Sequence, residues 1–176
     1  MNRTELARKI YELSHITGKF QLRSGQISNE YFDKYLFEGQ PEVLHAIAEQ
    51  MRNLIPEGVE GLAGLEMGGI PVVTMLSQMS GIPALFVRKK AKAYGTCKLA
   101  EGGQLSGRKL LIVEDVVTSG GQILLSAADL RKREAVVEDV LCVIDRESGG
   151  LEMLAKKGLH LQSLFRMSEI KNAVMG

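Results

Sequence analysis

Five short apolar runs, none strictly alternating with polar residues, punctuate the chain from residue 61 onward. They cover residues 61–65, 82–87, 109–113, 140–145 and 159–165. Helix-like stretches at 71–80, 121–133 and 149–157 separate most of them. Uninterrupted apolar strands are typical of sheets that helices cover on both faces, as in parallel sheets built from βαβ units. The pattern therefore predicts an α/β fold with a five-stranded, mainly parallel sheet flanked by helices.

The first 55 residues follow a different pattern. Asn2 and Glu5 have the spacing of a capping box, and apolar residues then recur at helical spacing. A second apolar helical face covers residues 41–54. The total of 176 residues is ordinary for one domain. We therefore expect a single domain over residues 1–176, with an N-terminal hood at 1–55 and an α/β core at 56–176.

The balance of charge argues against some classes of partner. Twenty-two Lys and Arg residues stand against 21 Asp and Glu, for a formal net charge of +1. Coating nucleic acid or an anionic membrane needs a large excess of positive charge, and no apolar run approaches the ~20 residues of a membrane span. No signal peptide is visible, and the two cysteines have no metal-ligand spacing. We expect a reduced cytoplasmic protein that binds neither nucleic acid nor membrane.

The strongest chemical signal is the segment LLIVEDVVTSGGQ at residues 110–122. Two acids, Glu114 and Asp115, end the apolar run, and a loop of hydroxyl residues and glycines leads into a predicted helix. Glycines let backbone amides approach an anion, and a helix N-terminus adds its positive end. At the carboxyl end of a strand this arrangement fits a phosphate, while the acids fit ribose hydroxyls or a bridging Mg²⁺. The segment predicts a ribose-phosphate pocket; an ordinary glycine-containing turn is the alternative.

A second signal is a concentration of positive charge. Residues 88–98 hold five basic side chains and no acid. They fall in a long polar gap between two predicted strands, and loops of that length are usually functional or disordered. A cationic loop with glycine hinges suits a lid that closes over a polyanion and expels water. We expect such a lid at residues 89–103; a solvated run of charge is the alternative.

The segment 113–122 resembles the ribose-phosphate loop of type I phosphoribosyltransferases, which replace the diphosphate of 5-phosphoribosyl 1-diphosphate (PRPP) with a nitrogenous base. Three further motifs make the chain similar to the orotate phosphoribosyltransferase family. The sequence FQLRSG at 20–25, continued by Ser28 and YFD at 31–33, resembles the family's orotate-side motif. RKKAK at 88–92, with the glycines that follow, resembles its catalytic loop, and DRE at 145–147 its base-recognition segment.

The resemblance implies transfer of the 5-phosphoribosyl group of PRPP to orotate, giving orotidine 5′-monophosphate and diphosphate in pyrimidine biosynthesis. It also implies a homodimer with shared active sites, and Mg²⁺ as a cofactor carried by the diphosphate rather than bound directly by the protein. Two alternatives stay open. One is a phosphoribosyltransferase for another base, and the other is a non-catalytic regulator that senses PRPP and binds nucleic acid.

Site residues follow from the same resemblance. The catalytic residues would be Lys92, Glu114 and Asp115. The PRPP ligands would be Arg88, Lys89, Lys92, Glu114, Asp115, Val116, Val117, Thr118, Ser119, Gly120, Gly121 and Gln122. The orotate ligands would be Arg23, Tyr31, Phe32, Thr118 and Arg146.

Three positions depart from the family pattern. Many relatives carry lysine in place of Arg23, some carry lysine in place of Gly68, and the usual lid has histidine in place of Tyr94. Gly68 belongs to the segment EMGGIP at 66–71, which resembles the family's diphosphate loop. The three histidines, His15, His45 and His160, share no ligand spacing, so we expect structural roles for them.

Overall fold

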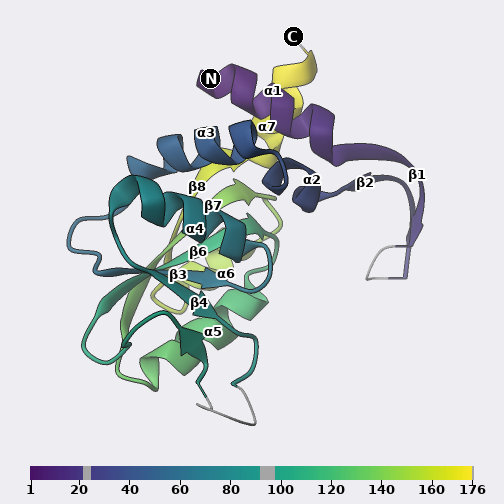
Figure 1. Cartoon of the computed structure of the whole chain (residues 1–176). Coiled ribbons are helices and arrows are strands. Elements are labelled where there is room, and N and C mark those ends of the chain that lie inside the picture. Colours follow the sequence, from purple (N-terminus) through teal and green to yellow (C-terminus); the bar gives the residue numbers. More distant parts are fainter. Residues whose placement is uncertain (22–24, 92–97, 176) are drawn as a thin grey trace.

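A mostly parallel sheet forms the centre of the molecule. The structure is a computed structural model that describes residues 1–21, 25–91 and 98–175 (Figure 1). Its sheet has the order β5-β4-β3-β6-β7-β8, and all neighbours are parallel except β5 and β4. The strands are β3 (Gly61–Leu65), β4 (Ala84–Val87), β5 (Ala100–Glu101), β6 (Lys109–Val117), β7 (Val136–Asp145) and β8 (His160–Arg166). The α/β prediction is confirmed, and the five predicted strands are the five parallel ones.

The observed strands differ from the predicted ones in three places. The two-residue strand β5 adds an antiparallel edge inside the segment predicted as a lid. Strand β7 begins at Val136, four residues before the predicted run at 140–145. Its first residues alternate between exposed Val136 and buried Val137, and an alternating segment does not appear as a continuous apolar run. Strand β6 continues to Val117, so the two acids of the ribose-phosphate segment lie within the strand and not after it.

Helices cover both faces of the sheet, as Figure 1 shows. One face packs against α3 (Pro41–Arg52) and α4 (Gly69–Ser80), with Ile47 and Leu76 in the same buried cluster as Leu141 of β7. The other face packs against α5 (Gly121–Arg131) and α6 (Gly150–Ala155). In the part of the chain that the structure describes, no helix is long and apolar enough to cross a membrane.

The N-terminal segment begins with α1 (Arg3–Ser14), whose predicted capping box is present. Asn2 Oδ1 accepts from the Glu5 amide at 2.9 Å, and Glu5 Oε2 accepts from the Asn2 amide at 3.0 Å. Helix α1 lies beside α7 (Met167–Met175), a helix that the sequence analysis did not predict, and the two termini are close together in Figure 1.

Strands β1 (His15–Gln21) and β2 (Ile27–Phe32) form an antiparallel hairpin that projects from the body of the molecule (Figure 1). The short helix α2 (Lys34–Glu38) follows it, with Asp33 as its N-cap: Asp33 Oδ1 accepts from the Tyr35 amide at 3.1 Å.

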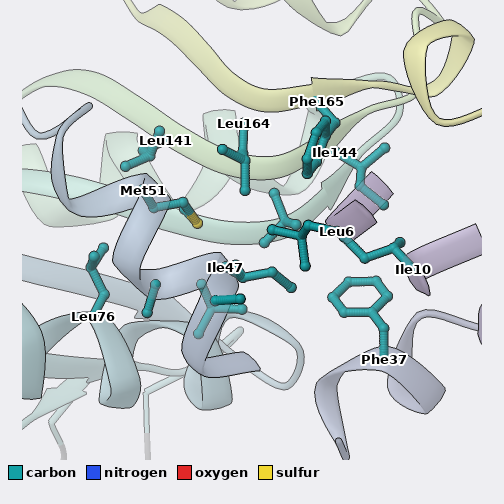
Figure 2. Packing of buried hydrophobic residues seen from close by; sticks show 14 of the residues in the cluster. Leu6, Ile10, Phe37, Ile47, Met51, Leu76, Leu141, Ile144, Leu164 and Phe165 are labelled. Carbon is teal, nitrogen blue, oxygen red and sulfur yellow. The ribbon is translucent and has the colours of Figure 1, made fainter. Parts of the chain in front are cut away.

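One hydrophobic cluster joins this N-terminal segment to the sheet. Figure 2 shows Leu6 and Ile10 of α1 close to the ring of Phe37, which points up from α2. The same cluster contains Ile144 of β7 and Phe165 of β8, and all five side chains are at most 1% exposed. Helix α2 is therefore anchored through Phe37, while Tyr35 and Leu36 of the same helix are exposed. The division into a hood and a core at residue 55 stays a prediction.

Candidate active site

The predicted motifs lie at the carboxyl ends of the parallel strands, which share one edge of the sheet. Backbone hydrogen bonds tie neighbouring strand ends together. The Glu66 amide, after β3, donates to Val87 O of β4 at 2.9 Å, and the Arg146 amide, after β7, donates to Val117 O of β6 at 2.9 Å. The edge therefore brings together segments that are far apart in the sequence.

The loop after β6 encloses a cavity of about 140 Å³. Its lining residues are Glu114, Val116, Val117, Thr118, Ser119, Gly120, Gly121, Gln122 and Ile123. Gly120 has a φ of 74°, a left-handed conformation that favours glycine, and it precedes α5 as the N-cap residue. Because Gly120 has no side chain to cap the helix, the first amides of α5 are available to an anion. Of the PRPP residues predicted in the 114–122 segment, all but Asp115 line this cavity.

Asp115 points to the other face of β6. Successive side chains of a strand alternate between faces, so Asp115 shares the face of Leu111 and Val113 in the cluster with α3 and α4. Its side chain is 1% exposed. Oδ2 lies 2.5 Å from Nζ of Lys34 on α2, and Oδ1 accepts from the Val116 amide at 2.6 Å. No sequence motif identifies Lys34.

A second residue of α2, Glu38, completes a buried group of charges around Asp115. Glu38 is 6% exposed, and no donor among the described residues reaches either of its carboxyl oxygens. A hydrogen bond between two carboxyl groups requires a proton on one of them. Burial, together with the hydrogen bond and charge of Asp115, raises the pKa of Glu38 to about 9. Glu38 is therefore protonated at neutral pH, and its carboxyl group carries a proton that it can donate to Asp115.

The two other titratable members of this group respond to the same surroundings. Burial and the charge of Asp115 raise the pKa of Glu114 to about 8. Burial alone would lower the pKa of Lys34, but its hydrogen bond and charge interaction with Asp115 outweigh burial and raise the pKa. The ammonium group of Lys34 is therefore charged, and its positive charge partly neutralises the group formed by Glu38, Glu114 and Asp115.

The turn between β3 and α4 approaches the same carboxylate. The Glu66–Met67 peptide bond is cis, and Gly68 follows it. A Cβ atom on Gly68 would overlap the Asp115 carboxyl group, so the turn can lie against Asp115 only because residue 68 lacks a side chain. Glu66 Oε1 accepts from the Lys89 amide at 2.6 Å, which fixes the start of the predicted lid against this turn.

A second cavity, of about 150 Å³, lies next to the loop. It is lined by Tyr11, His15, Ser28, Glu30, Tyr31, Phe32, Arg146, Met167 and Lys171. Three of the predicted orotate ligands, Tyr31, Phe32 and Arg146, are therefore neighbours. The hydrogen bond from the Arg146 amide to Val117 O connects this cavity to the loop of the first.

Several lining residues of this second cavity, among them His15, Met167 and Lys171, were not predicted from the sequence. His15, which we expected to have a structural role, contributes to the wall; its ring stacks on Tyr11 with centroids 4.7 Å apart, and Nε2 lies 2.8 Å from Glu30 Oε2. Lys171 and Met167 belong to α7, which was not predicted. No local motif marks these residues, because three separate segments contribute them.

The remaining predicted residues occupy other places. Thr118 lines the loop cavity and not the second one. Arg88, at the end of β4, is half-buried, and its Nε has no hydrogen-bond partner among the described residues. Arg23 and Lys92 lie outside the described residues. Within residues 1–21, 25–91 and 98–175, no group of three His, Cys, Asp or Glu side chains is placed to hold a metal ion.

The open parallel sheet, the glycine-rich loop after its central strand and the cavity beside that loop are features that this chain shares with solved phosphoribosyltransferases. A crystal structure of Mycobacterium tuberculosis H37Rv orotate phosphoribosyltransferase in complex with PRPP matches the fold with a TM-score of 0.82 and 28% identity. The match covers 96% of this chain and 98% of that chain.

Sequence comparison identifies the family. The chain is 48% identical over 168 residues to the orotate phosphoribosyltransferase of Nocardioides sp. strain JS614, covering 96% of this chain and 94% of the relative. It is 42% identical to the enzyme of Methanocella arvoryzae, over 95% of this chain and 96% of the relative. No family model matches the chain. The chain belongs to the orotate phosphoribosyltransferase family.

Proposed function

We propose that the protein transfers the 5-phosphoribosyl group of PRPP to orotate, giving orotidine 5′-monophosphate and diphosphate for pyrimidine synthesis. The observation that carries the proposal is the adjacency of the two cavities. A glycine-rich loop at a helix N-terminus and an aromatic cavity with an arginine share the hydrogen bond between Arg146 and Val117. Family membership supports the same reaction.

The loop cavity suits the ribose 5-phosphate part of PRPP. Backbone amides at Gly120 and Gly121, the hydroxyl groups of Thr118 and Ser119, and the positive end of α5 suit the phosphate. Glu114 lines the same cavity and suits a ribose hydroxyl. A carboxyl group can both donate and accept when protonated and only accepts when ionised, and Glu114 passes between these states near pH 8.

The second cavity suits the base. A cavity of about 150 Å³ is comparable to one that holds a benzene ring in another protein. Tyr31 and Phe32 would form a wall against the flat ring. The planar guanidinium of Arg146 would bind the orotate carboxylate or a ring carbonyl through two parallel N–H groups.

The chemical step breaks the bond between ribose C1 and the diphosphate and forms a bond from C1 to a ring nitrogen of orotate, which loses its proton. Positive charge develops on the ribose ring while negative charge gathers on the diphosphate. Cations aimed at the diphosphate stabilise that transition state more than the ground state. We assign this role to Lys92, with Arg88 and Lys89 as diphosphate ligands. The unpaired Nε of Arg88 supports its assignment.

Mg²⁺ would enter with the diphosphate, whose charge it neutralises. The carboxyl oxygens of Glu114 and Asp115 are of the kind that this cation prefers. Both oxygens of Asp115 already have partners, Lys34 and the Val116 amide. This favours a metal carried by the substrate over one held directly by Asp115. Removal of Mg²⁺ with EDTA should abolish turnover, and its return should restore it.

A homodimer with shared active sites is the assembly that we propose, and the cytoplasm is the compartment. Light scattering after gel filtration would establish the size of the assembly. Sharing is tested at low PRPP concentration by mixing Lys92→Ala, which should lower kcat, with Asp115→Asn, which should weaken PRPP binding. If lid residues act in the neighbouring subunit's site, the mixture regains part of the activity, and if each site is built from one subunit it does not.

Consumption of orotate in the presence of PRPP and Mg²⁺, followed spectrophotometrically, tests the reaction. Adenine, hypoxanthine and uracil serve as competing substrates. Diphosphate release with one of these bases but not with orotate would reject the orotate assignment. Salt-sensitive binding of nucleic acid without any turnover would instead favour a regulator.

A further inference from the structure

Lys34 of helix α2 forms an ion pair with Asp115, the carboxylate to which we assign the ribose hydroxyls of PRPP. Phe37, which is 0% exposed, anchors the helix in the buried cluster of Figure 2, and its neighbours Lys34 and Glu38 then face β6. Asp115 accordingly has a partner at each oxygen, a hydrogen bond from the Val116 amide at Oδ1 and an ion pair with the Lys34 ammonium at Oδ2, and the protonated carboxyl group of Glu38 interacts with it as well. A ribose hydroxyl that binds Asp115 must therefore displace a donor of α2.

Lys34 is the donor that can leave. Its side chain is 33% exposed, whereas Glu38 is 6% exposed. A lysine ammonium is a compact charge on a flexible stem with three donors, so it can change partner without movement of the backbone. If it left Asp115 for water, a largely buried ion pair would be broken at a cost in free energy, and a second anion close by would offset part of that cost.

The nearest place for such an anion is the turn at residues 66–69. Oδ2 of Asp115 lies 2.5 Å from Lys34 Nζ, and the same oxygen occupies the space that a Cβ on Gly68 would take. The ammonium group is therefore directly beside the turn. None of the four residues of the turn, Glu66 to Gly69, is a cation. A diphosphate placed against the turn's backbone amides would have the Lys34 ammonium beside it, next to the Asp115 carboxylate that lies against Gly68.

We propose that Lys34 is a PRPP-binding residue, which neutralises Asp115 in the free protein and pairs with the diphosphate once ribose hydroxyls occupy Asp115. The inference rests on the proposed function in taking PRPP as the ligand, Asp115 as the acceptor for its ribose hydroxyls and the turn at residues 66–69 as the place of its diphosphate. Lys34 thus links the two ends of the substrate, because the ribose end releases the cation that the diphosphate end receives.

Lysine acetylation followed by mass spectrometry tests this on the unmodified protein. Ribose 5-phosphate, which has hydroxyls but no diphosphate, should release Lys34 from Asp115 and increase its acetylation rate. Mg²⁺-diphosphate and PRPP should decrease the rate. Lys9, which makes an exposed ion pair of 2.6 Å with Glu42, is the internal reference and should be unaffected. Equal Lys34 rates with and without all three ligands would overturn the proposal.

Calorimetric titration of two variants gives an independent result. Lys34→Gln keeps a donor for Asp115 but removes the charge, and should weaken binding of PRPP and of Mg²⁺-diphosphate by about ten- to a hundredfold, the usual loss for a hydrogen bond to a charged group. Its affinity for ribose 5-phosphate should stay unchanged or increase. Lys34→Arg should recover most of the loss, and the control Lys9→Gln should match the wild type.

Two results for Lys34→Gln would contradict the proposal. Unchanged affinity for Mg²⁺-diphosphate would mean that Lys34 serves only as the counter-ion of Asp115. Tighter binding of PRPP would mean that Lys34 only competes with the substrate. Turnover of orotate by the wild type is measured separately. A protein that binds PRPP through Lys34 but does not consume orotate would refute the proposed function and leave the role of Lys34 intact.

Discussion

Replacement of Glu38 by glutamine should remove a pH dependence of stability that the buried acids impose. The pKa of Glu38 is raised in the folded protein from an ordinary value of 4.5 to about 9. Between these two values the folded chain keeps a proton that the unfolded chain releases. The contribution of Glu38 to stability is therefore fully present below pH 4.5 and is lost as the pH rises through 9. Glutamine has the same shape, keeps a donor for Asp115 and does not ionise.

The size of the effect follows from the number of protons. One proton changes the free energy of unfolding by about 1.4 kcal/mol for each pH unit. Between pH 6 and pH 8, the wild type should lose up to about 3 kcal/mol through Glu38, and Glu38→Gln should avoid that loss. The stability of the variant relative to the wild type should increase by this amount over the interval. The pKa of Glu114 is raised to about 8, so Glu114 also makes the free energy of unfolding decrease with rising pH, both in the wild type and in the variant.

Urea unfolding at several pH values between 6 and 8.5 measures this difference directly, since the midpoint and slope of each transition give the free energy of unfolding. Glu57→Gln is the matched control, because Glu57 is exposed, and its curve should run parallel to that of the wild type. Parallel curves for Glu38→Gln and the wild type would show that Glu38 is already ionised when folded. That result would refute the shared proton between Glu38 and Asp115.

Four further substitutions test the assignments of single residues. Asp115→Asn should weaken PRPP binding at least about tenfold by calorimetry, because it removes a charged acceptor for ribose; undiminished affinity would reject the ribose contact. Lys92→Ala should lower kcat far more than it weakens PRPP binding, since its charge matters most as the diphosphate departs, and an unchanged kcat would remove Lys92 from that role. Arg146→Gln should raise the KM for orotate about tenfold or more while leaving the affinity for PRPP within about threefold; equal losses for both substrates would argue against a base contact. Phe37→Ala should lower the free energy of unfolding by about 3–5 kcal/mol in urea titrations, as a fully buried ring is lost; a loss under about 1 kcal/mol would mean that α2 is not anchored there.

The parts of the fold that could be predicted are those whose pattern is local. Strand β3 is buried at all five positions, so its sequence is an unbroken apolar run with the predicted bounds. Helix α5 follows directly from the glycines before it. The missed elements are short or depend on contacts elsewhere. Strand β5 has two residues, and α2 has five and is anchored by the single buried ring of Phe37.

The same distinction separates the two cavities. The loop cavity is built almost entirely from one continuous segment, residues 114–123, so its composition could be recognised before its geometry was known. The base cavity combines α1, the β1–β2 hairpin, the residue after β7 and helix α7. Its predicted members came from a resemblance to a family. His15 and Lys171 had no such motif, and only the packing of α1 against α7 brings their segments together.

The charge balance around Asp115 shows why a motif alone is not enough to describe this site. The adjacent acids Glu114 and Asp115 appear in the sequence as two equivalent ligands, but the alternation of a strand places them on opposite faces. Asp115 then meets Lys34 and Glu38, which lie far away in the chain. Within the described residues, the buried acids Glu38 and Asp115 and the half-buried Glu114 share one cation, so they cannot all ionise and one of them must hold a proton. In the proposed mechanism the substrate enters this same balance, because ribose hydroxyls would compete for Asp115 and the diphosphate would compete for Lys34. If Lys34 binds the diphosphate as we propose, the ionisation of the site and its affinity for PRPP are set together by α2, a helix that no motif marks.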